Sequence, residues 1–424
     1  MTKLSESGIL NLNDQKKFRH SRTPRKEQSF KIYGPRQVGK TTLVKLFLQE
    51  YGVPATPETT KDKKRTYIPG GLLPNNTEKK LPALLTYTYH TGDEQTFADN
   101  LASRDLNIIK NIIEDADLLV IDEAQKIPHI GTALKLIVDN IPNIYVIVTG
   151  SSAFDLANMT AEPLTGRKNT LKLYPISIQE MIQNKGRYET ERKSEEILIY
   201  GTYPNIVEAQ GYKRKAKRIT EIKDSYLIKD ILTFNKVKSS QIVMNLLTKL
   251  AFQVGSEVST TELGRNLGID GKTVRRYLDL LEKAFVIFRL GGLSRNLRKE
   301  ITRMNKYYFY DNGIRNALIS NFNGLNIRND VGMLWENFMM VERMKRNEYA
   351  GLVTNYYFWR TYDQQEVDLV EERGGKLHGY EFKWNSNKLV RAPKDWLETY
   401  KEADFKVYTP KNFLDFCGVQ DTKD

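Results

Sequence analysis

The stretch Gly34–Thr41, GPRQVGKT, has the residue types of a phosphate-binding loop and satisfies G-x-x-x-x-G-K-[ST] in full. Its glycines allow backbone N–H groups to curl around phosphate oxygens in conformations that a side chain would block. A helix beginning at Lys40 would aim its N-terminal dipole at the same phosphates. Lys40 is expected to reach the β- and γ-phosphates, and the Thr41 hydroxyl to bind Mg²⁺. The predicted nucleotide-binding residues are Gly34, Pro35, Arg36, Gln37, Val38, Gly39, Lys40, Thr41 and Thr42.

Two adjacent acids, Asp122 and Glu123, follow the apolar run LLVI. Asp122 is expected to hold the hydration shell of the Mg²⁺, and Glu123 to orient and deprotonate an attacking water. An ordinary strand end that meets solvent would also explain these acids if they stood alone. Their position after the phosphate-binding loop, on a predicted neighbouring strand, favours a hydrolytic site.

Two weaker candidates lie further along the chain. Ser151 or Thr149, in VTGSS, could sense the γ-phosphate, although a polar end of a strand is an equal alternative. Arg167, in LTGR, could stabilise charge on the transferred phosphoryl group, in cis or from a neighbouring subunit. Its alternative is a surface arginine after a glycine turn.

The elements that must position these residues follow an α/β pattern in residues 29–176. Continuous apolar runs that end in polar residues are typical of strands buried on both faces of a parallel sheet. Helical stretches alternate with them, which predicts a parallel sheet with helices on both faces. Residues 1–28 are polar and basic and predict a flexible arm, and residues 53–82 predict a long surface insertion.

Residues 177–248 are mostly helical in period and predict a helical linker or lid. Residues 249–312 predict a helix-turn-helix, with Thr260 or Thr261 as the first helix cap, followed by two strands of a wing. If this module touches DNA, we expect one set of basic residues in the groove and another on the backbone. A packing role is an equal alternative. The groove set is Lys272, Arg275 and Arg276, and the backbone set is Arg295, Arg298 and Lys299.

The C-terminal part, residues 328–418, contains a second group of acids. EVDLVEE and LHGYEFKW are predicted to pair as strands around the turn RGGK, which places Asp368 opposite Glu381 and Lys383. These carboxylates could hold Mg²⁺ and polarise a water at a phosphodiester. The pattern resembles the D…E-x-K core of the restriction-endonuclease-like fold, and Glu336 matches the acid of its first helix. There are two alternatives: a solvated hairpin with ordinary charged residues, or a domain that binds nucleic acid without cleaving it.

Several motifs occur in the order seen in a large prokaryotic ATPase family: GPRQVGKTTL, LLVIDEAQKIP, VTGSSAFDL, LTGR, YPISIQEM, GTYPNIV and SYLIKDIL. The resemblance runs from about Phe30 to Phe413. It implies an AAA-type ATPase core that uses ATP and Mg²⁺, then a helical linker, a winged helix and a nuclease-like fold of unknown function. The insertion at residues 53–82 departs from the family pattern.

The composition favours a cytoplasmic protein with a polyanionic partner. The net charge is +13, the only cysteine is Cys417, and no apolar stretch is long enough to span a membrane. We therefore expect an ATPase whose nucleotide state controls a module that engages DNA. The alternatives are a slow nucleotide switch that recruits a protein partner, and an ATP-gated nuclease; homo-oligomerisation is compatible with each.

Overall fold

The computed structural model describes residues 29–54, 85–151, 168–233, 239–293, 304–385 and 390–419. The described chain forms two compact units, the first ending at Leu173 and the second beginning at Tyr174. Several predictions lie outside the described residues: the basic arm, most of the insertion, Arg167, and the backbone set Arg295, Arg298 and Lys299. None of the helices in the described part combines the length and apolar composition needed to cross a bilayer.

The first unit is built on a six-stranded sheet with the order β2-β3-β4-β5-β1-β6. All its neighbouring strands run parallel, which confirms the predicted parallel α/β architecture. The strand with Asp122, β4, was predicted beside the strand before the loop, β1, but β5 lies between them. The strands are β1 (Ser29–Tyr33), β2 (Gly52–Pro54), β3 (Leu85–Thr91), β4 (Leu118–Asp122), β5 (Tyr145–Gly150) and β6 (Lys168–Lys172).

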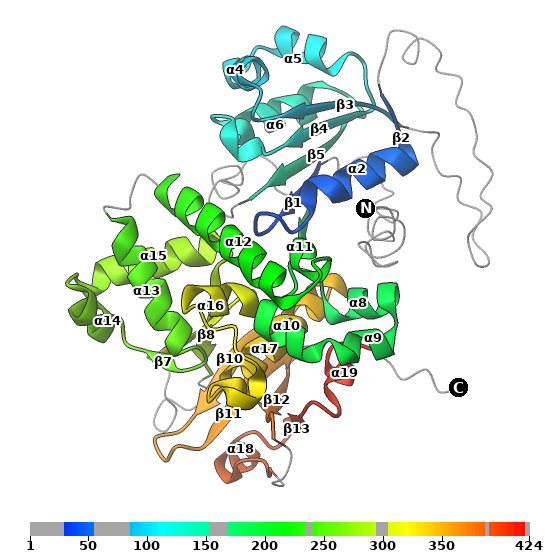
Figure 1. Ribbon diagram of the computed structural model, residues 1–424. Coiled ribbons are helices and arrows are strands. Elements are labelled where there is room, and N and C mark those ends of the chain that lie inside the picture. The colour runs from blue at the N-terminus through cyan, green and yellow to red at the C-terminus, as the bar shows by residue number, and fades with distance from the viewer. Residues whose placement is uncertain are drawn as a thin grey trace, which may run out of the picture. The chain divides into compact units, whose positions relative to one another are not determined.

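Helices cover both faces of this sheet, as predicted (Figure 1). Helix α2 (Lys40–Tyr51) lies on one face, and the other carries α4 (Gln95–Ser103), α5 (Leu106–Ile113) and α6 (Ile130–Asn140). The core of that second face joins apolar residues of these three helices to β4 and β5. Burial on both faces explains why β4 reads as an uninterrupted apolar run. Glu123 follows the end of β4, and a short 3₁₀ helix, Ala124–Lys126, begins directly after it.

The second unit begins with helices, as its sequence pattern predicts. Ser177 caps the first of them with a capping box, in which Ser177 and Glu180 satisfy each other's backbone N–H groups. The helices up to the helix-turn-helix are α8 (Ile178–Lys185), α9 (Arg187–Arg192), α10 (Ser194–Tyr200), α11 (Pro204–Val207), α12 (Tyr212–Thr233) and α13 (Ser240–Phe252).

Two short helices, α14 (Thr260–Leu267) and α15 (Gly271–Lys283), form the predicted helix-turn-helix. The first is capped by Ser259, whose hydroxyl accepts from the Glu262 N–H, rather than by either predicted threonine. Val274, Leu278 and Leu281 of α15 are buried. The basic groove set on α15 is exposed: Lys272, Arg275 and Arg276.

The strands of the predicted wing and those of the predicted nuclease-like module share one seven-stranded sheet, ordered β13-β12-β11-β10-β8-β9-β7. The link is a parallel pairing of β8 with β10. The strands are β7 (Glu257–Val258), β8 (Ile287–Gly292), β9 (Asn305–Phe309), β10 (Asn355–Arg360), β11 (Glu366–Arg373), β12 (Lys376–Phe382) and β13 (Asp404–Tyr408).

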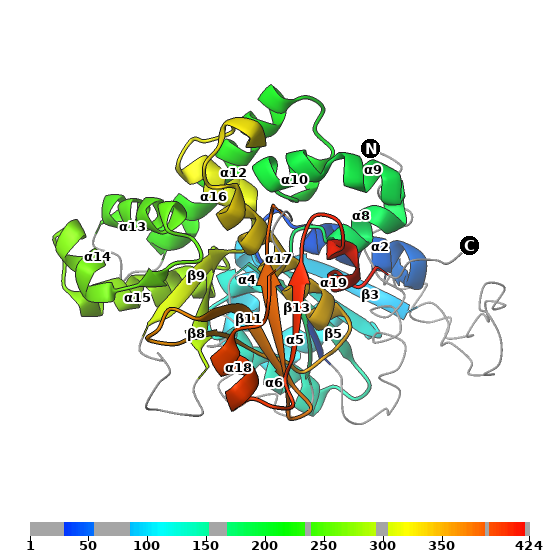
Figure 2. The ribbon, with the colours of Figure 1, turned by 90° about the horizontal axis from the view of Figure 1, so that it is seen from below.

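The hairpin of β11 and β12 turns at Gly374 and Gly375, as predicted. Both glycines have positive φ, which a two-residue hairpin of this kind requires. The long helix α17 (Val331–Tyr349) packs on β12 and β9, and α18 (Lys394–Thr399) contributes Trp396 to a separate apolar core (Figure 2). The remaining elements are α16 (Asn312–Leu318), a 3₁₀ turn (Leu325–Ile327) and α19 (Phe413–Phe416).

Candidate functional site

The phosphate-binding loop has a backbone that its two glycines make possible. Gly34 has φ 151°, and a Cβ there would lie 2.0 Å from the Leu173 carbonyl oxygen, so no other residue fits. Gly39 has φ 98° and immediately precedes α2. Of the other predicted loop residues, Pro35 and Val38 are buried, Arg36 is half-buried, and Gln37 and Thr42 are exposed.

Lys40 is held inside this loop. Its side chain is 5% exposed, and Nζ donates to the carbonyl oxygens of Gly34 at 3.0 Å and Pro35 at 2.7 Å. A lysine this buried needs polar partners of this kind. The ammonium is thus fixed beside the loop backbone, where the motif predicts the phosphates.

Asp122 is surrounded by hydroxyl groups from three different elements. Thr41, at the start of α2, and Tyr89, on β3, both donate to its Oδ2 at 2.8 Å. Thr149, on β5, donates to its Oδ1. Burial, followed by the hydrogen bond to Asp122, raises the pKa of Tyr89 well above its usual range, so this hydroxyl remains a donor. Hydroxyl donors carry no charge, so they orient this carboxylate without neutralising it.

Glu123 has a left-handed backbone with φ 52°, which is uncommon for a residue with a side chain. Its N–H donates to the Thr149 hydroxyl at 3.1 Å. Its carboxylate accepts a hydrogen bond from the Gln125 amide, and the same amide donates to the Ser151 hydroxyl at 3.1 Å. Gln125 thus connects the predicted base to a predicted phosphate sensor.

The structure brings together most of the residues predicted for this site and adds two more. Thr149 contacts both acids, whereas Ser151 accepts from the Gln125 amide that also donates to Glu123. Tyr89 and Gln125 were not predicted. Gln125 could have been suspected because it lies two residues after Glu123. Nothing in the sequence distinguished Tyr89.

The C-terminal acids also lie close to one another. Asp368 is next in register to Glu381, because Leu369 pairs with Tyr380, and its Oδ2 accepts from the Phe382 N–H at 2.8 Å. A shift of register against β10 places Asp368 in a β-bulge, a feature that redirects side chains. Burial, then the nearby Asp368 charge, raises the pKa of Glu336 to about 8 and that of Glu381 to about 7.

Glu381 and Glu336 each have a charged or hydroxyl partner within the protein. Lys383 Nζ lies 2.5 Å from Glu381 Oε1, and Tyr308 donates to Glu336 Oε1 at 2.6 Å. Lys306, which the sequence reasoning did not select, lies 4.0 Å from the same Glu336 oxygen. No group of three or more His, Cys, Asp or Glu side chains in the described ranges is arranged to hold a metal ion. The second metal site stays a prediction that this arrangement does not favour.

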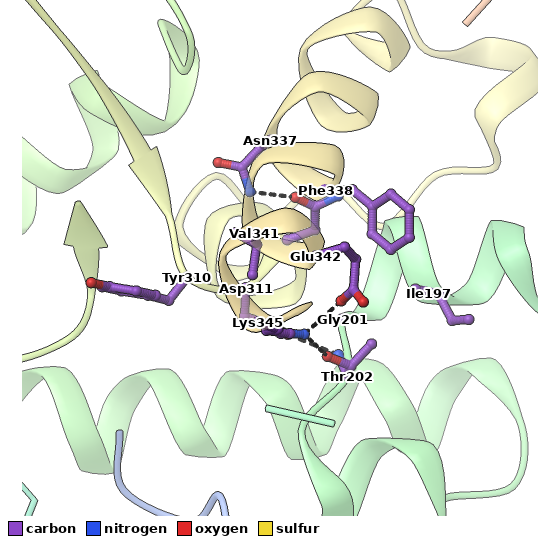
Figure 3. A pocket seen from close by; sticks show the side chains of 11 residues that line it. Ile197, Gly201, Thr202, Tyr310, Asp311, Asn337, Phe338, Val341, Glu342 and Lys345 are labelled. Carbon is purple, nitrogen blue, oxygen red and sulfur yellow. Dashed lines mark hydrogen bonds and ion pairs between the residues drawn. The ribbon is translucent and has the colours of Figure 1, made fainter. Parts of the chain in front are cut away.

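A small cavity of about 10 Å³ lies between α10 and α17 in the second unit, large enough for about one water molecule (Figure 3). Lys345 donates to Glu342 at 2.7 Å and to the Thr202 hydroxyl at 3.3 Å, and Glu342 accepts from the Ile178 N–H. These polar groups satisfy one another across the helices, so the cavity is part of the packing of this unit rather than a ligand site.

Comparisons with protein families divide the chain into three parts. Residues 26–182 match a family described as an AAA domain. Residues 191–326 and 331–418 match two domains of unknown function (DUF8612 and DUF4143). The first match supports a nucleotide-binding ATPase of AAA type in the unit that contains the phosphate-binding loop.

Similar curated proteins have no described function. An uncharacterized protein of Mycobacterium tuberculosis is 26% identical over 85% of this chain and 71% of its own length. An uncharacterized protein of Haemophilus influenzae is 27% identical over 55% of this chain and 58% of its own length. The match to the Mycobacterium tuberculosis protein covers parts of both units, and both relatives are uncharacterized.

Two solved structures were also matched. AMPPCP-bound DnaA from Aquifex aeolicus is 16% identical and covers 61% of this chain and 82% of its own, with a TM-score of 0.23. A protein from Vibrio cholerae is 12% identical and covers 71% of this chain and 89% of its own, with a TM-score of 0.15. Scores this low carry no argument about fold or function.

Proposed function

We propose that the protein is a Mg²⁺-dependent ATPase that uses its nucleotide state to control contact of its C-terminal unit with nucleic acid. One observation carries the ATPase proposal: three hydroxyl groups donate hydrogen bonds to Asp122, next to the first residues of α2. They belong to Thr41, Tyr89 and Thr149. These neutral donors orient the Asp122 carboxylate beside a loop built for phosphate.

In this mechanism Lys40 and the loop N–H groups bind the β- and γ-phosphates. Thr41 and Asp122 are the residues that would hold Mg²⁺, which neutralises charge on the phosphate oxygens when bound. Glu123 takes a proton from the attacking water, and Gln125 keeps its carboxylate oriented. Ser151, tied to the same amide, is placed to respond to the γ-phosphate.

The nucleic-acid part of the proposal rests on exposed positive charge and on the sheet that the helix-turn-helix region shares with the C-terminal strands. The exposed basic groove set lies on α15, whose opposite side is packed against the unit. The net charge of +13 adds a general attraction to polyanions. A shared sheet joins this helix-turn-helix to the C-terminal strands, so contact at one could be sensed at the other.

The experiment is the ATPase rate of the full chain with and without duplex DNA, single-stranded DNA and RNA. We expect stimulation by one of these, and none in Lys40→Ala, with exposed Lys45→Ala as the matched control. The double variant Arg275→Ala/Arg276→Ala should weaken binding to duplex DNA and flatten its salt dependence. Lys394→Ala, at an 81% exposed lysine elsewhere, should not. Unchanged affinity in the double variant would give the helix-turn-helix a packing role.

A second candidate function is a slow nucleotide-dependent switch that recruits a protein partner. The contact of Gln125 with Glu123 favours it, because a base held by an amide is less free to engage a water. Stable ATP occupancy with negligible turnover, unaffected by any nucleic acid, would favour this function over the first.

A further inference from the structure

Lys306 is a charged residue in an unusual position. It lies on β9, within the seven-stranded sheet, and its side chain is only 3% exposed. Lysine is almost never this buried unless it is paired. Its chain neighbours in NKYYF are aromatic or polar strand residues, so nothing in the local pattern distinguishes it.

The partners of Lys306 are Glu366 and one acid of the C-terminal site, Glu336. Its ammonium forms an ion pair with Glu366 and lies 4.0 Å from Glu336 Oε1 and 5.2 Å from the centre of the Phe358 ring. Burial alone would lower the pKa of this lysine, but attraction to Glu336, Glu366 and Asp368 outweighs burial and raises it. The side chain is therefore a permanent cation among these carboxylates.

We propose that the ammonium of Lys306 is the resident cation of the Glu336–Asp368–Glu381 site, and that it takes the place of a divalent metal ion there. A Mg²⁺ ion needs several oxygen ligands at about 2.1 Å in near-octahedral geometry. The ammonium forms an ion pair with Glu366 and lies 4.0 Å from Glu336, and its charge also acts on Asp368, so it repels such an ion and competes with it for these carboxylates. The absence of a metal-type ligand group among the described residues agrees with this reading.

The lysine of the E-x-K pattern has a different position. Lys383 is 42% exposed and pairs with Glu381 at the edge of the site, so it is not the buried cation. Glu381 Oε2 is buried and has no hydrogen-bond partner in the described part of the chain. If Lys306 is removed, this oxygen and the carboxylates of Glu336 and Asp368 become available to a metal ion.

The proposal makes the C-terminal unit a module that binds without metal-dependent cleavage. It concerns the acids alone and does not depend on ATP hydrolysis in the other unit. The test is Mn²⁺ binding to the full chain without nucleotide, by calorimetry and electron paramagnetic resonance. All proteins carry Asp122→Asn, which removes the carboxylate that would hold Mg²⁺ in the first unit.

We expect no stoichiometric Mn²⁺ binding when Lys306 is present. Lys306→Ala should gain one Mn²⁺ site, with an affinity at least about tenfold higher than any Mn²⁺ binding to the protein that retains Lys306. Lys306→Arg, which keeps the charge, should gain no site, and adding Asp368→Asn to Lys306→Ala should remove the new one. A folded Lys306→Ala protein that gains no Mn²⁺ binding would overturn the proposal.

A second measurement, on the protein that retains Lys306, does not depend on whether Lys306→Ala folds. Stoichiometric Mn²⁺ binding with Lys306 in place, lost in Asp368→Asn, would also overturn the proposal. If Lys306→Ala is unstable, Mn²⁺ should raise its melting temperature and leave that of Lys306→Arg unchanged. Failure of Mn²⁺ to stabilise Lys306→Ala would count against the proposal in the same way as a missing site.

Discussion

The two units each contain a group of buried or half-buried carboxylates, and they stabilise negative charge in different ways. In the first unit, Asp122 accepts hydrogen bonds from three uncharged hydroxyls. In the second, ammonium groups of Lys306 and Lys383 lie beside Glu336 and Glu381. A hydroxyl orients a carboxylate and leaves its charge, whereas an ammonium cancels it.

This difference separates a site prepared for an added cation from a site that already contains one. Charge left on Asp122 can attract Mg²⁺ that arrives with a nucleotide. Charge on the C-terminal acids is partly offset by Lys306 and Lys383, which weakens the attraction of these acids for a metal ion. The same residue type, a buried acid at the end or bulge of a strand, therefore predicts different chemistry in the two units.

The largest effect is expected from the same substitution made in each site. Glu123→Gln should lower ATP turnover about 10²- to 10⁴-fold, the usual contribution of a general base, while ATP binding is retained. Glu381→Gln should leave turnover unchanged, because Glu381 lies in the other unit, where it pairs with Lys383. Single-turnover hydrolysis and nucleotide affinity measure both. Parental turnover in Glu123→Gln would mean that another group activates the water.

The next effect concerns stability and compares two lysines. Lys306→Met should lower the free energy of unfolding by about 3–5 kcal/mol, because it leaves buried acids without their counter-charge. Lys383→Met should cost less than about 1 kcal/mol, since a lysine that is 42% exposed gains little from its pair. Urea unfolding of the second unit, followed by its tryptophan fluorescence, measures the difference. Equal losses would show that the ammonium of Lys306 has no special role.

Much of the first site could be predicted from sequence because its parts are local. Eight consecutive residues define the loop, and a continuous apolar run identifies the strand that ends in Asp122. The order of strands was not predictable in the same way, since no local pattern indicates that β5 separates β1 from β4. Tyr89 was missed because its contact with Asp122 depends on that order.

The second site depends on contacts between distant parts of the chain. Lys306 meets Glu366 only because β8 pairs with β10 and brings the wing strands into the sheet of the hairpin. The hairpin itself was predicted, because its turn glycines and alternating strands are adjacent in sequence. Short-range patterns thus gave Asp368 and Glu381, but not the cation that determines what these acids do.

A smaller effect is expected at a buried acid outside both sites, Glu180. Burial raises its pKa from 4.5 to about 7, although hydrogen bonds from Ser177 oppose the shift. Between these pH values the folded protein retains a proton that the unfolded chain releases, so stability falls as pH rises through the window. Glu180→Gln should reduce this fall by about 2–3 kcal/mol.

The measurement is urea unfolding at several pH values between about 4.5 and about 7, with Glu189→Gln, at an exposed acid, as the control. Asp311, whose pKa burial raises to about 6, adds a slope of the same sign that should remain in both variants. An unchanged pH slope in Glu180→Gln would show that Glu180 is already ionised in the folded protein.

The smallest expected effect tests how the first unit holds its base. Gln125 donates to Glu123 and to Ser151, so Gln125→Ala should remove the link between the base and the predicted sensor. We expect turnover to fall about tenfold with little change in KM, since the positioning of Glu123 is affected and phosphate binding is not. Gln95→Ala, which removes a surface amide bonded only to Asp99 among the described residues, is the matched control.

Ser151→Ala, made alone and together with Gln125→Ala, distinguishes a link from two independent contacts. If the amide acts through both partners, the double variant should lose no more turnover than Gln125→Ala alone. Additive losses would mean that Ser151 acts directly on the nucleotide. A rise in turnover in Gln125→Ala would show instead that the amide restrains Glu123, as the slow-switch function requires. Removal of the amide would then free the Glu123 carboxylate to engage water.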